Sequence, residues 1–379
     1  MIIAVNCWIL RNKQLDGIGN FTVETLKRII LNNPDDDFLI MCDKNFNEDY
    51  FNFPNTTLHK VFPPYRHPAL YLLLMETKVR KFLKKYNPDV FLSMDGFLSL
   101  TSSVKQVPVI YDLNFEHYPK DLKFRNRIYY RTFFKRFAKK ATRIATISEY
   151  SKEDIINRYK IDANKIDNVS CGIKEKFVPL SSDDILETQN KYSNGSQYFF
   201  FVGSMHPRKN IKRLIQAFEI FKKEITTTAK LVLSGPVWDD SDVKTVLDDH
   251  IFKKDIIFTG RVSDDELKNL LGSATALCFV PTFEGFGLPI VEAFQAGVPV
   301  ICSNVTSMPE VAGNAAILVD PFNIKSISEA MRQMYFNEEV RKEFVMRGHQ
   351  RKNLFSWDKT AGLLYKCVKS AANKDLKAD

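Results

Sequence analysis

Residues 198–210 read YFFFVGSMHPRKN: five large apolar residues, then a glycine and, shortly after it, two adjacent cations. The apolar run is short and unbroken, which is typical of a strand buried on both faces. Residues 210–225 follow, with apolar side chains at helical spacing. This stretch therefore predicts a strand, a tight loop and a helix, which is the building unit of a parallel sheet covered by helices.

The same unit recurs on both sides of this stretch. Toward the C-terminus we predict strands over 230–233, 255–259, 274–280 and 298–302, with helices between them. Toward the N-terminus we predict strands over 2–5, 38–42, 90–93, 107–111 and 143–146. The pattern breaks near 173–197, where turn-forming residues gather.

We therefore predict an α/β protein with two Rossmann-like domains, each with a parallel sheet. The first domain is expected over 1–175, a linker over 176–195 and the second domain over 196–354. Ligands of such sheets bind beyond the carboxyl ends of the strands, so we expect the site in the cleft between the two domains.

Composition limits the class of protein. The 379 residues are 45% hydrophobic and include 30 Phe, which excludes a chain that is mainly disordered. No apolar run approaches the 18 or so residues of a membrane-spanning helix. The start, MIIAVN, is expected to be a first strand and not a signal peptide. Six scattered Cys residues favour reduced thiols and a cytoplasmic location.

Charge is unevenly distributed. The chain carries a net charge of +9, and residues 60–143 alone contain 18 Lys/Arg against 6 Asp/Glu. Such a basic half suggests nucleic acid, anionic lipid or a phosphorylated substrate as partner. Residues 123–143 hold nine Lys/Arg and no acid, interleaved with aromatic residues. This segment is either a core-packed helix with a solvated basic face or a helix whose cations meet anionic lipid.

The loop after the strand at 198–202 is a candidate phosphate site. Gly203 permits a tight turn, and Arg208 and Lys209 lie just before a helix that Asn210 can cap. A helix N-terminus attracts anions, and an Arg binds a diphosphate bidentately. A solvated basic loop is the alternative.

Residues 281–294 read PTFEGFGLPIVEAF and follow another buried strand. Glu284 lies in the loop beside Gly285 and Gly287, which allow a ligand to approach the backbone closely. Glu292 lies one turn into the next helix, and the two carboxylates could hold sugar hydroxyls. Acids that complement the helix dipole are the alternative, which accounts for Glu292 but not for Glu284.

Three further loops are candidates. Arg261 and Val262 end a strand before a helix and add a second cation to the site, unless Arg261 is an ordinary surface residue. Residues 16–20, DGIGN, form an incomplete dinucleotide motif, and we expect a glycine loop at Gly17–Gly19 that faces the cleft. In residues 111–117, YDLNFEH, the strand-end position favours a function for Asp112, whereas His117 is more often an ordinary loop residue. No metal-binding motif appears, so no metal or other cofactor is expected.

Taken in order, these motifs resemble the group 1 retaining glycosyltransferases of GT-B fold, family 4 in the usual classification. Glu284 and Glu292 match the E-x7-E signature, and residues 208–210, RKN, match the diphosphate segment. Residues 305–311, VTSMPEV, match a segment near the nucleotide. This variant of the motifs resembles bacterial mannosyltransferases of surface-polysaccharide assembly.

The resemblance implies roles for these residues. Glu284 would contact the donor hexose, Glu292 the ribose hydroxyls, and Arg208 with Lys209 the diphosphate. Residues around them would complete the donor site: Gly17, Gly19, Gly203, Arg261, Val262, Gly285, Phe286, Gly287 and Leu288. The first domain would bind the acceptor and the second the nucleotide sugar. A C-terminal helix over 355–379 would cross back to the first domain.

The chain departs from the family at two positions. Tyr111-Asp112 stands where many members have His-Asp, so the role of that His passes to Tyr111, to His117 or to backbone. Ser204 stands where many members have a phosphate-binding Arg.

The implied function is metal-independent, retaining transfer of a hexose from a nucleoside-diphosphate sugar to a glycan or a lipid-linked acceptor. GDP-mannose is the favoured donor and a UDP-hexose the second choice. The expected location is the cytoplasm, with peripheral attachment to the inner face of the membrane. A sugar-nucleotide epimerase or a glycan phosphorylase of the same fold is the alternative, although no pyridoxal-phosphate lysine signature is seen. A nucleic-acid binder is disfavoured, because no RRM, KH or helix-turn-helix signature is present.

Overall fold

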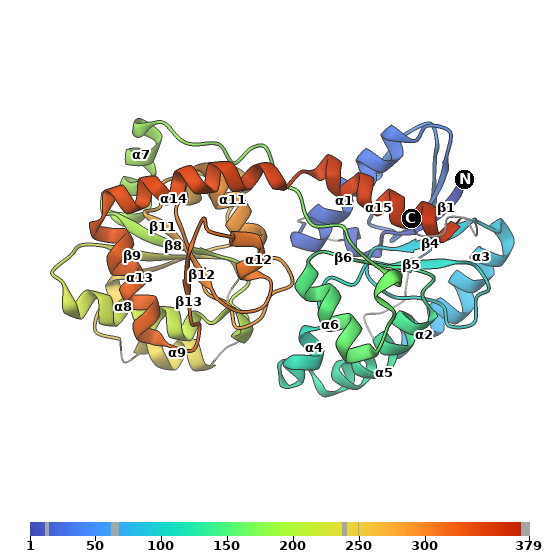
Figure 1. Ribbon diagram of the computed structural model, residues 1–379, viewed down its shortest axis with the longest axis horizontal. Helices are drawn as coiled ribbons and strands as arrows, with labels where there is room; N and C mark the ends of the chain where they lie inside the picture. Colours follow the sequence, from blue (N-terminus) through green and yellow to red (C-terminus); the bar gives the residue numbers. More distant parts are fainter. Residues whose placement is uncertain (12–14, 62–67, 237–240, 249, 373–379) are drawn as a thin grey trace. The chain divides into compact units, whose positions relative to one another are not determined.

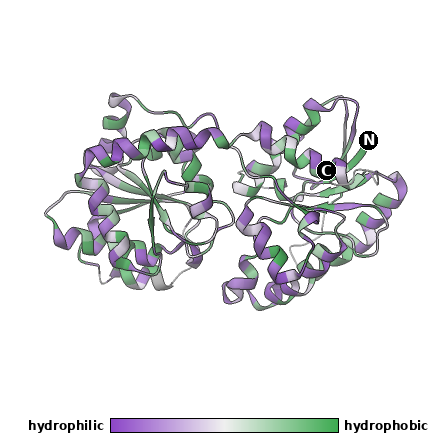
Figure 2. Ribbon diagram, in the orientation of Figure 1, coloured by the Kyte–Doolittle hydropathy of each residue, from purple (hydrophilic) through white to green (hydrophobic). Residues whose placement is uncertain are grey.

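A computed structural model describes residues 1–11, 15–61, 68–236, 241–248 and 250–372. The chain forms two compact units (Figure 1): unit 1 comprises Met1–Gly172 and Ser356–Asp379, and unit 2 comprises Ile173–Phe355. Each unit contains a parallel sheet with helices on both faces, which confirms the predicted α/β class. In Figure 2 the strands of both sheets are mostly hydrophobic, as expected for sheets buried on both faces.

The main sheet of unit 1 has the order β3-β2-β1-β4-β5, and all its pairs are parallel. Its strands are β1 (Ile2–Asn6), β2 (Asp37–Cys42), β3 (Thr56–Lys60), β4 (Val90–Ser93) and β5 (Gln106–Pro108). The pair β6 (Ile144–Thr146) and β7 (Ile166–Asn168) continues from β5 through a bridge between Val109 and Ala145. The sequence does not predict β3, because this edge strand, TTLHK, lacks a buried apolar run.

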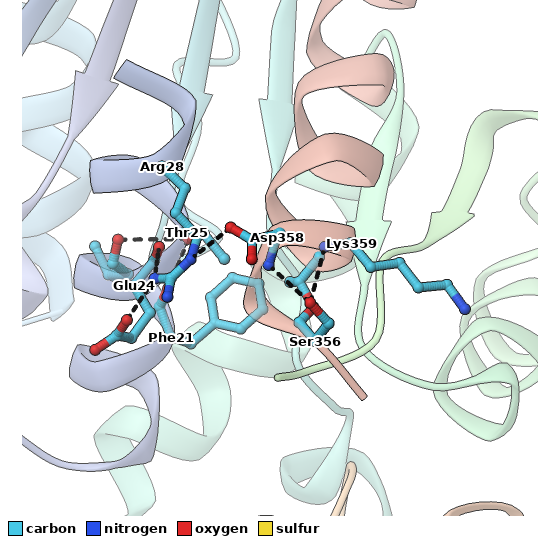
Figure 3. Close-up of polar contacts among 9 residues, drawn as sticks. Phe21, Glu24, Thr25, Arg28, Ser356, Asp358 and Lys359 are labelled. Carbon is cyan, nitrogen blue, oxygen red and sulfur yellow. Dashed lines mark hydrogen bonds and ion pairs between the residues drawn. The ribbon is translucent and has the colours of Figure 1, made fainter. Parts of the chain in front are cut away.

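Helices cover both faces of this sheet. They are α1 (Gly17–Asn32), α2 (Pro68–Leu74), α3 (Arg80–Tyr86), α4 (Asn114–His117), α5 (Phe124–Lys140), α6 (Glu149–Tyr159) and α15 (Trp357–Ala372). The C-terminal helix α15 packs along α1, where Arg28 Nε donates to Asp358 Oδ1 at 3.0 Å (Figure 3). The rings of Phe21 and Trp357 meet edge to face at 6.0 Å. Residues 373–379, which the predicted helix over 355–379 includes, lie outside the described residues.

The sheet of unit 2 has the order β10-β9-β8-β11-β12-β13, again all parallel. Its strands are β8 (Tyr198–Val202), β9 (Lys230–Ser234), β10 (Ile256–Gly260), β11 (Ala276–Phe279), β12 (Val300–Ser303) and β13 (Ile317–Val319). One face carries α8 (Ile211–Glu224), α9 (Ser241–Asp248) and α13 (Ile324–Phe336). The other carries α10 (Asp264–Gly272), α11 (Leu288–Ala296) and α14 (Glu338–Arg351), and α12 (Met308–Ala312) follows β12.

The segment expected as a linker, 176–195, is largely helical and belongs to unit 2. It contains α7 (Ser182–Ser193), whose N-terminus is capped by Ser181 accepting from the Asp184 amide. The Tyr192 hydroxyl donates to Glu266 at 2.7 Å, which fixes α7 against α10. Ser181, one of the turn-forming residues that suggested a linker, is therefore a helix cap.

Both strand orders reverse direction once. In unit 1 the chain moves from β1 outward to β3 and then returns to β4, so β1 and β4 flank the switch point. In unit 2 the corresponding neighbours are β8 and β11. Ligands of doubly wound sheets bind in the crevice outside the carboxyl ends of the two strands at such a point.

All six cysteines are buried and none is in a disulfide. In the part of the chain that the structure describes, no helix has both the length and the apolar character needed to span a bilayer.

Candidate active site

The loop after β8 carries the two cations singled out from the sequence. Arg208 and Lys209 lie in a short 3-10 turn, Pro207–Lys209, and Asn210 follows with a left-handed φ of 63°. The Asn210 amide donates to the carbonyls of Val280, at 3.0 Å, and Pro321, at 2.7 Å. The prediction that the Asn210 side chain caps α8 is therefore wrong. Its side chain instead holds this loop against the segments that follow β11 and β13.

Glu284, in the loop after β11, lies between the two cations. Arg208 Nη1 donates to Glu284 Oε2 at 2.7 Å, and Lys209 Nζ donates to the same oxygen. The Glu284 side chain is only 17% exposed. Burial alone would raise the pKa of Glu284, but the Lys209 and Arg208 charges outweigh it and lower the pKa to about 2. The carboxylate is thus ionised throughout the neutral range.

Both cations are fixed by further contacts. The Lys209 side chain is 10% exposed, and its ammonium lies 4.7 Å from the centre of the Phe279 ring, a cation–π distance. Arg208 Nη1 also donates to the Phe283 carbonyl, at 3.2 Å. The result is a preorganised site of net positive charge at the switch point of unit 2. One oxygen of the Glu284 carboxylate already accepts hydrogen bonds from both cations.

Glycines let the loops at this edge approach one another. Gly203 and Gly287 have φ of 144° and 99°. A Cβ on Gly287 would lie 2.7 Å from Met308 Cε. Gly285 and Phe286 are buried, and Leu288 begins α11. The sequence analysis missed Gly235, where a Cβ would lie 2.1 Å from the Gly203 carbonyl oxygen; its signal is a glycine directly after strand β9.

Glu292, one turn into α11, is half-buried like Glu284. Its pKa, however, is shifted in the opposite direction. Burial raises the pKa of Glu292 to about 7, although Lys174 and Lys176 act in the opposite direction. Both lysines form ion pairs with Asp264. No hydrogen bond or ion pair to Glu292 occurs within the described part of the chain. This carboxyl group can therefore accept hydrogen bonds from a ligand. Lys174 and Lys176 were not predicted, since no spacing in the sequence relates them to Glu292.

Arg261 and Val262 lie farther along the same edge of the sheet, after β10. Arg261 is exposed and Val262 half-buried. The Gly235 amide donates to the Gly260 carbonyl at 2.8 Å, which joins the loops after β9 and β10.

In unit 1, the two glycines of residues 16–20 are not in a loop. Gly17 and Gly19 form the first turn of α1, because the Asp16 side chain accepts from the Gly19 amide at 2.8 Å and caps the helix. Gly17 is exposed and Gly19 is buried.

The candidates for the role of the family's His are both engaged. The Tyr111 hydroxyl donates to the Met94 carbonyl at 2.9 Å, and burial raises the pKa of Tyr111 well above its usual value. The His117 ring meets Asp154 Oδ2 at 2.8 Å and also contacts Arg158. Asp112 Oδ1 accepts from the Asn114 amide at 2.9 Å, so this carboxylate braces the turn into α4.

No cluster of three or more His, Cys, Asp or Glu side chains that could hold a metal ion is found among the described residues.

Comparison with known proteins identifies the family. Residues 183–351 match the family described as Glycosyl transferases group 1, and residues 35–177 match Glycosyltransferase Family 4. The chain belongs to the group 1 glycosyltransferases. This glycosyltransferase is 29% identical to O-antigen chain mannosyltransferase B of Escherichia coli over 360 residues, which cover 91% of this chain and 93% of that protein.

Solved structures show the fold. Sucrose-phosphate synthase from Thermosynechococcus elongatus matches with a TM-score of 0.76 at 17% identity and covers 98% of this chain and 99% of its own. The Anabaena HepE structure with UDP and glucose matches with a TM-score of 0.75 at 14% identity and covers 98% and 100%. The glycosyltransferase thus has the GT-B fold, as predicted.

Thr306 belongs to the segment 305–311 that resembles the family, but the sequence predicts no role for it in the site. Thr306, after β12, has a φ of 57°, which is costly for a β-branched residue. Its buried hydroxyl has no hydrogen-bond partner among the residues described. The neighbouring Ser307 hydroxyl donates to the Glu284 carbonyl at 2.8 Å, so this turn holds the Glu284 loop.

The raised pKa of Glu292 predicts a pH-dependent stability. A carboxyl group whose pKa is about 7 in the folded state and 4.5 in the unfolded state favours folding in its protonated form. Its contribution to the free energy of unfolding is therefore complete below about pH 4.5 and is lost as the pH rises through 7. Relative to the wild type, Glu292→Gln should gain about 1–3 kcal/mol in free energy of unfolding between pH 5 and pH 8. Urea unfolding at the two pH values measures it. The exposed Glu187→Gln serves as control, and an equal difference at both pH values would refute the assignment.

Proposed function

We propose that this glycosyltransferase moves a hexose, mannose in the favoured case, from a nucleoside-diphosphate sugar to a hydroxyl of a glycan or lipid-linked acceptor, with retention of anomeric configuration. The observation that carries the proposal is the cluster of Arg208, Lys209 and Glu284 at the switch point of unit 2. Two fixed cations match a diphosphate, and a buried ionised carboxylate matches sugar hydroxyls.

The chemistry follows from where charge develops. When the bond between the anomeric carbon and the phosphate breaks, negative charge grows on the phosphate oxygen and the sugar becomes oxocarbenium-like. Arg208 and Lys209 are held in place before the reaction and stabilise that oxygen without reorganisation. The acceptor hydroxyl attacks the anomeric carbon from the same face from which the leaving group departs. Its proton passes to the departing phosphate. The cations supply the electrostatic stabilisation that a metal ion provides in other transferases.

Other residues then take supporting roles. In the bound state Glu284 exchanges part of its ion pairing for hydroxyls of the hexose. Glu292, which lacks a hydrogen-bond partner among the described residues, accepts from the ribose hydroxyls. Gly203, Gly285 and Gly287 leave room for the ligand beside the backbone. The Tyr111 hydroxyl is held by the Met94 carbonyl and the His117 ring by Asp154. Backbone groups near Asp112 are therefore the remaining candidates for the role that a His plays in many family members.

The donor assignment has two arms. GDP-mannose is favoured because the chain resembles a protein named as an O-antigen mannosyltransferase over nearly its whole length. A UDP-hexose is the second choice, since a neighbour of the same fold contains UDP and glucose.

A thermal-shift screen of nucleotide sugars tests the function. A true donor at 100 times its Kd should add about 2.7 kcal/mol of stability, and its nucleoside diphosphate should stabilise as well. Donor hydrolysis and transfer should persist in EDTA. Absence of stabilisation by every GDP- and UDP-sugar would refute the proposal, and loss of activity in EDTA would refute its metal-independent form.

We also propose that the enzyme binds an anionic membrane surface on the cytoplasmic side through α5. The aromatic face of α5 packs inward, since Tyr129, Phe134 and Phe137 are buried. Phe124 and Ile128 are 65% and 50% exposed. Exposed cations continue the same helical stripe: Arg131, Lys135 and Lys139. Two exposed apolar residues followed by cations suit the headgroup region of an anionic bilayer.

Charge reversal on α5 should weaken this attachment. Lys135→Glu with Lys139→Glu should reduce sedimentation with anionic vesicles severalfold, because each well-placed cation contributes about 1 kcal/mol. Binding of the wild type should vanish in neutral vesicles and at high salt. The matched control reverses two exposed lysines of α15, Lys366→Glu with Lys369→Glu. Equal binding to neutral vesicles, or an equal loss in the control, would contradict a role for α5.

A further inference from the structure

The switch point of unit 1 carries a polar pair that the proposed donor chemistry does not use. Asn6 ends β1, and Asp95 follows the neighbouring β4 (Figure 1). Asn6 Nδ2 donates to Asp95 Oδ1 at 2.7 Å, although 89 residues separate them. In unit 2 the equivalent position, after β8 and β11, holds the contact between Arg208 and Glu284. The two sheets therefore place a charged contact at corresponding points.

Asp95 is only partly satisfied by the protein. Its Oδ1 accepts from Asn6, from the Ser93 hydroxyl at 2.9 Å and from the Phe97 backbone amide at 3.4 Å, whereas no hydrogen bond to Oδ2 occurs among the described residues. The side chain is half-buried. Burial raises the pKa of Asp95 to about 6 despite these donors, so the ionised form lacks full compensation. A half-buried carboxylate oxygen without a donor is suited to accept a ligand hydroxyl.

A cluster of aromatic rings begins two residues after Asp95, at Phe97, whose backbone amide donates to Asp95 Oδ1. Tyr71, Tyr129 and Tyr130 each lie close enough for the Asp95 charge to raise their pKa. The Phe97 ring joins them, with its centre 5.2 Å from that of Tyr71 and 6.1 Å from those of Tyr129 and Tyr130. Tyr129 is 6% exposed, and its hydroxyl has no hydrogen-bond partner in the described part of the chain. An unsatisfied buried hydroxyl costs free energy that a ligand could recover.

We propose that Asp95 and Tyr129 bind the hydroxyls of a neutral saccharide, the acceptor end of the transfer reaction, with the tyrosine rings around them contacting its C–H faces. The inference rests on the proposed function, because that reaction needs a hydroxylated acceptor. A carboxylate and a phenol oxygen match vicinal hydroxyls, and the negative faces of aromatic rings attract the positive C–H edges of a sugar. Asp95 adjoins Met94, whose carbonyl holds Tyr111, so the subsite borders the predicted reacting residues.

Binding of methyl glycosides, followed by saturation-transfer NMR, tests the subsite. The probes are the methyl glycosides of mannose, galactose, rhamnose and N-acetylglucosamine, with GDP present to occupy the donor site. At least one should receive saturation on its ring protons from the wild type. Asp95→Asn and Tyr129→Phe should each weaken that binding about fivefold to tenfold, the scale of one hydrogen bond to a charged or buried group.

Matched controls come from the amino-terminal ends of the strands of the same sheet, opposite the ends at which Asp95 lies. Asp36 precedes β2, is 7% exposed and accepts from the Tyr365 hydroxyl at 2.7 Å. Asp36→Asn and Tyr365→Phe should leave glycoside binding unchanged, even where they lower stability. A merely structural Tyr129 would make Tyr129→Phe neutral or stabilising without any effect on binding.

The outcomes separate this inference from the proposed function. Asp95→Asn should retain wild-type calorimetric affinity for the nucleoside diphosphate and wild-type donor hydrolysis. Failure of all four glycosides to bind the wild type, or equal losses in the Asp36 and Tyr365 variants, would overturn the subsite while leaving the donor chemistry intact. Glycoside binding in a protein that binds no nucleotide sugar would instead refute the proposed function, and with it the acceptor role of the subsite, while leaving Asp95 and Tyr129 as a saccharide site.

Discussion

Glu284→Gln should lower kcat for transfer by about 100-fold or more, with a much smaller change in affinity for the nucleoside diphosphate. The wild-type carboxylate is ionised, since its pKa is about 2, and it is held between Arg208 and Lys209. A neutral amide of the same shape removes the negative charge that, in the proposed reaction, binds the hydroxyls of the hexose as positive charge develops on the sugar. An interaction used mainly in the transition state lowers kcat more than ground-state binding, and roughly 3 kcal/mol corresponds to this factor.

Steady-state kinetics with the donor identified by thermal shift measures the effect. Glu219→Gln is the matched control, because Glu219 also forms an ion pair with a lysine, Lys223, but on α8. The control should retain wild-type kcat. A Glu284→Gln variant with wild-type kcat would remove Glu284 from the mechanism, and a variant that loses diphosphate affinity to the same extent would make it a ground-state binding residue.

Arg208→Ala and Lys209→Ala should each weaken nucleoside diphosphate binding about 10-fold to 100-fold, while the free nucleoside binds almost as before. Each cation would make charge-assisted hydrogen bonds to the diphosphate, worth roughly 1.5–3 kcal/mol apiece. The nucleoside lacks the phosphates and so does not sense the change. In each single variant Glu284 keeps one of its two cationic partners, which limits the cost to folding.

Calorimetric titration with both ligands separates the contributions. Lys223→Ala removes an exposed cation from the same unit and should leave both affinities unchanged. A double variant would leave Glu284 buried without a counter-charge, so it is best combined with Glu284→Gln. Equal losses for nucleoside and diphosphate would show that the cations act on the fold of the loop and not on the phosphates.

The sequence determined the elements whose signals are local. The run YFFFV at 198–202 fills β8 because a strand buried on both faces needs continuous apolar residues. The helix predicted between the strands at 255–259 and 274–280 is α10, which begins with a capping box formed by Ser263 and Glu266. The E-x7-E motif placed Glu284 in a loop and Glu292 on a helix, since a strand end, two glycines and a proline all lie within that stretch.

Local patterns also misled where one residue type serves two purposes. Gly17 and Gly19 suggested a loop but form the first turn of α1, because the Asp16 cap outweighs the low helix propensity of glycine. The turn-forming residues near 181 suggested a linker, but Ser181 among them caps α7. In both cases the deciding hydrogen bond is a cap, which a composition-based reading does not see.

Only the tertiary structure decided which charges meet. The contact between Arg208 and Glu284 spans 76 residues, and that between Asn6 and Asp95 spans 89. Each depends on which strands are neighbours in a parallel sheet, and that order is set by long-range packing, not by any repeat in the sequence. The opposite pKa shifts of Glu284 and Glu292 have the same origin, because burial disfavours both charges and only Glu284 has two cations in contact to reverse the effect.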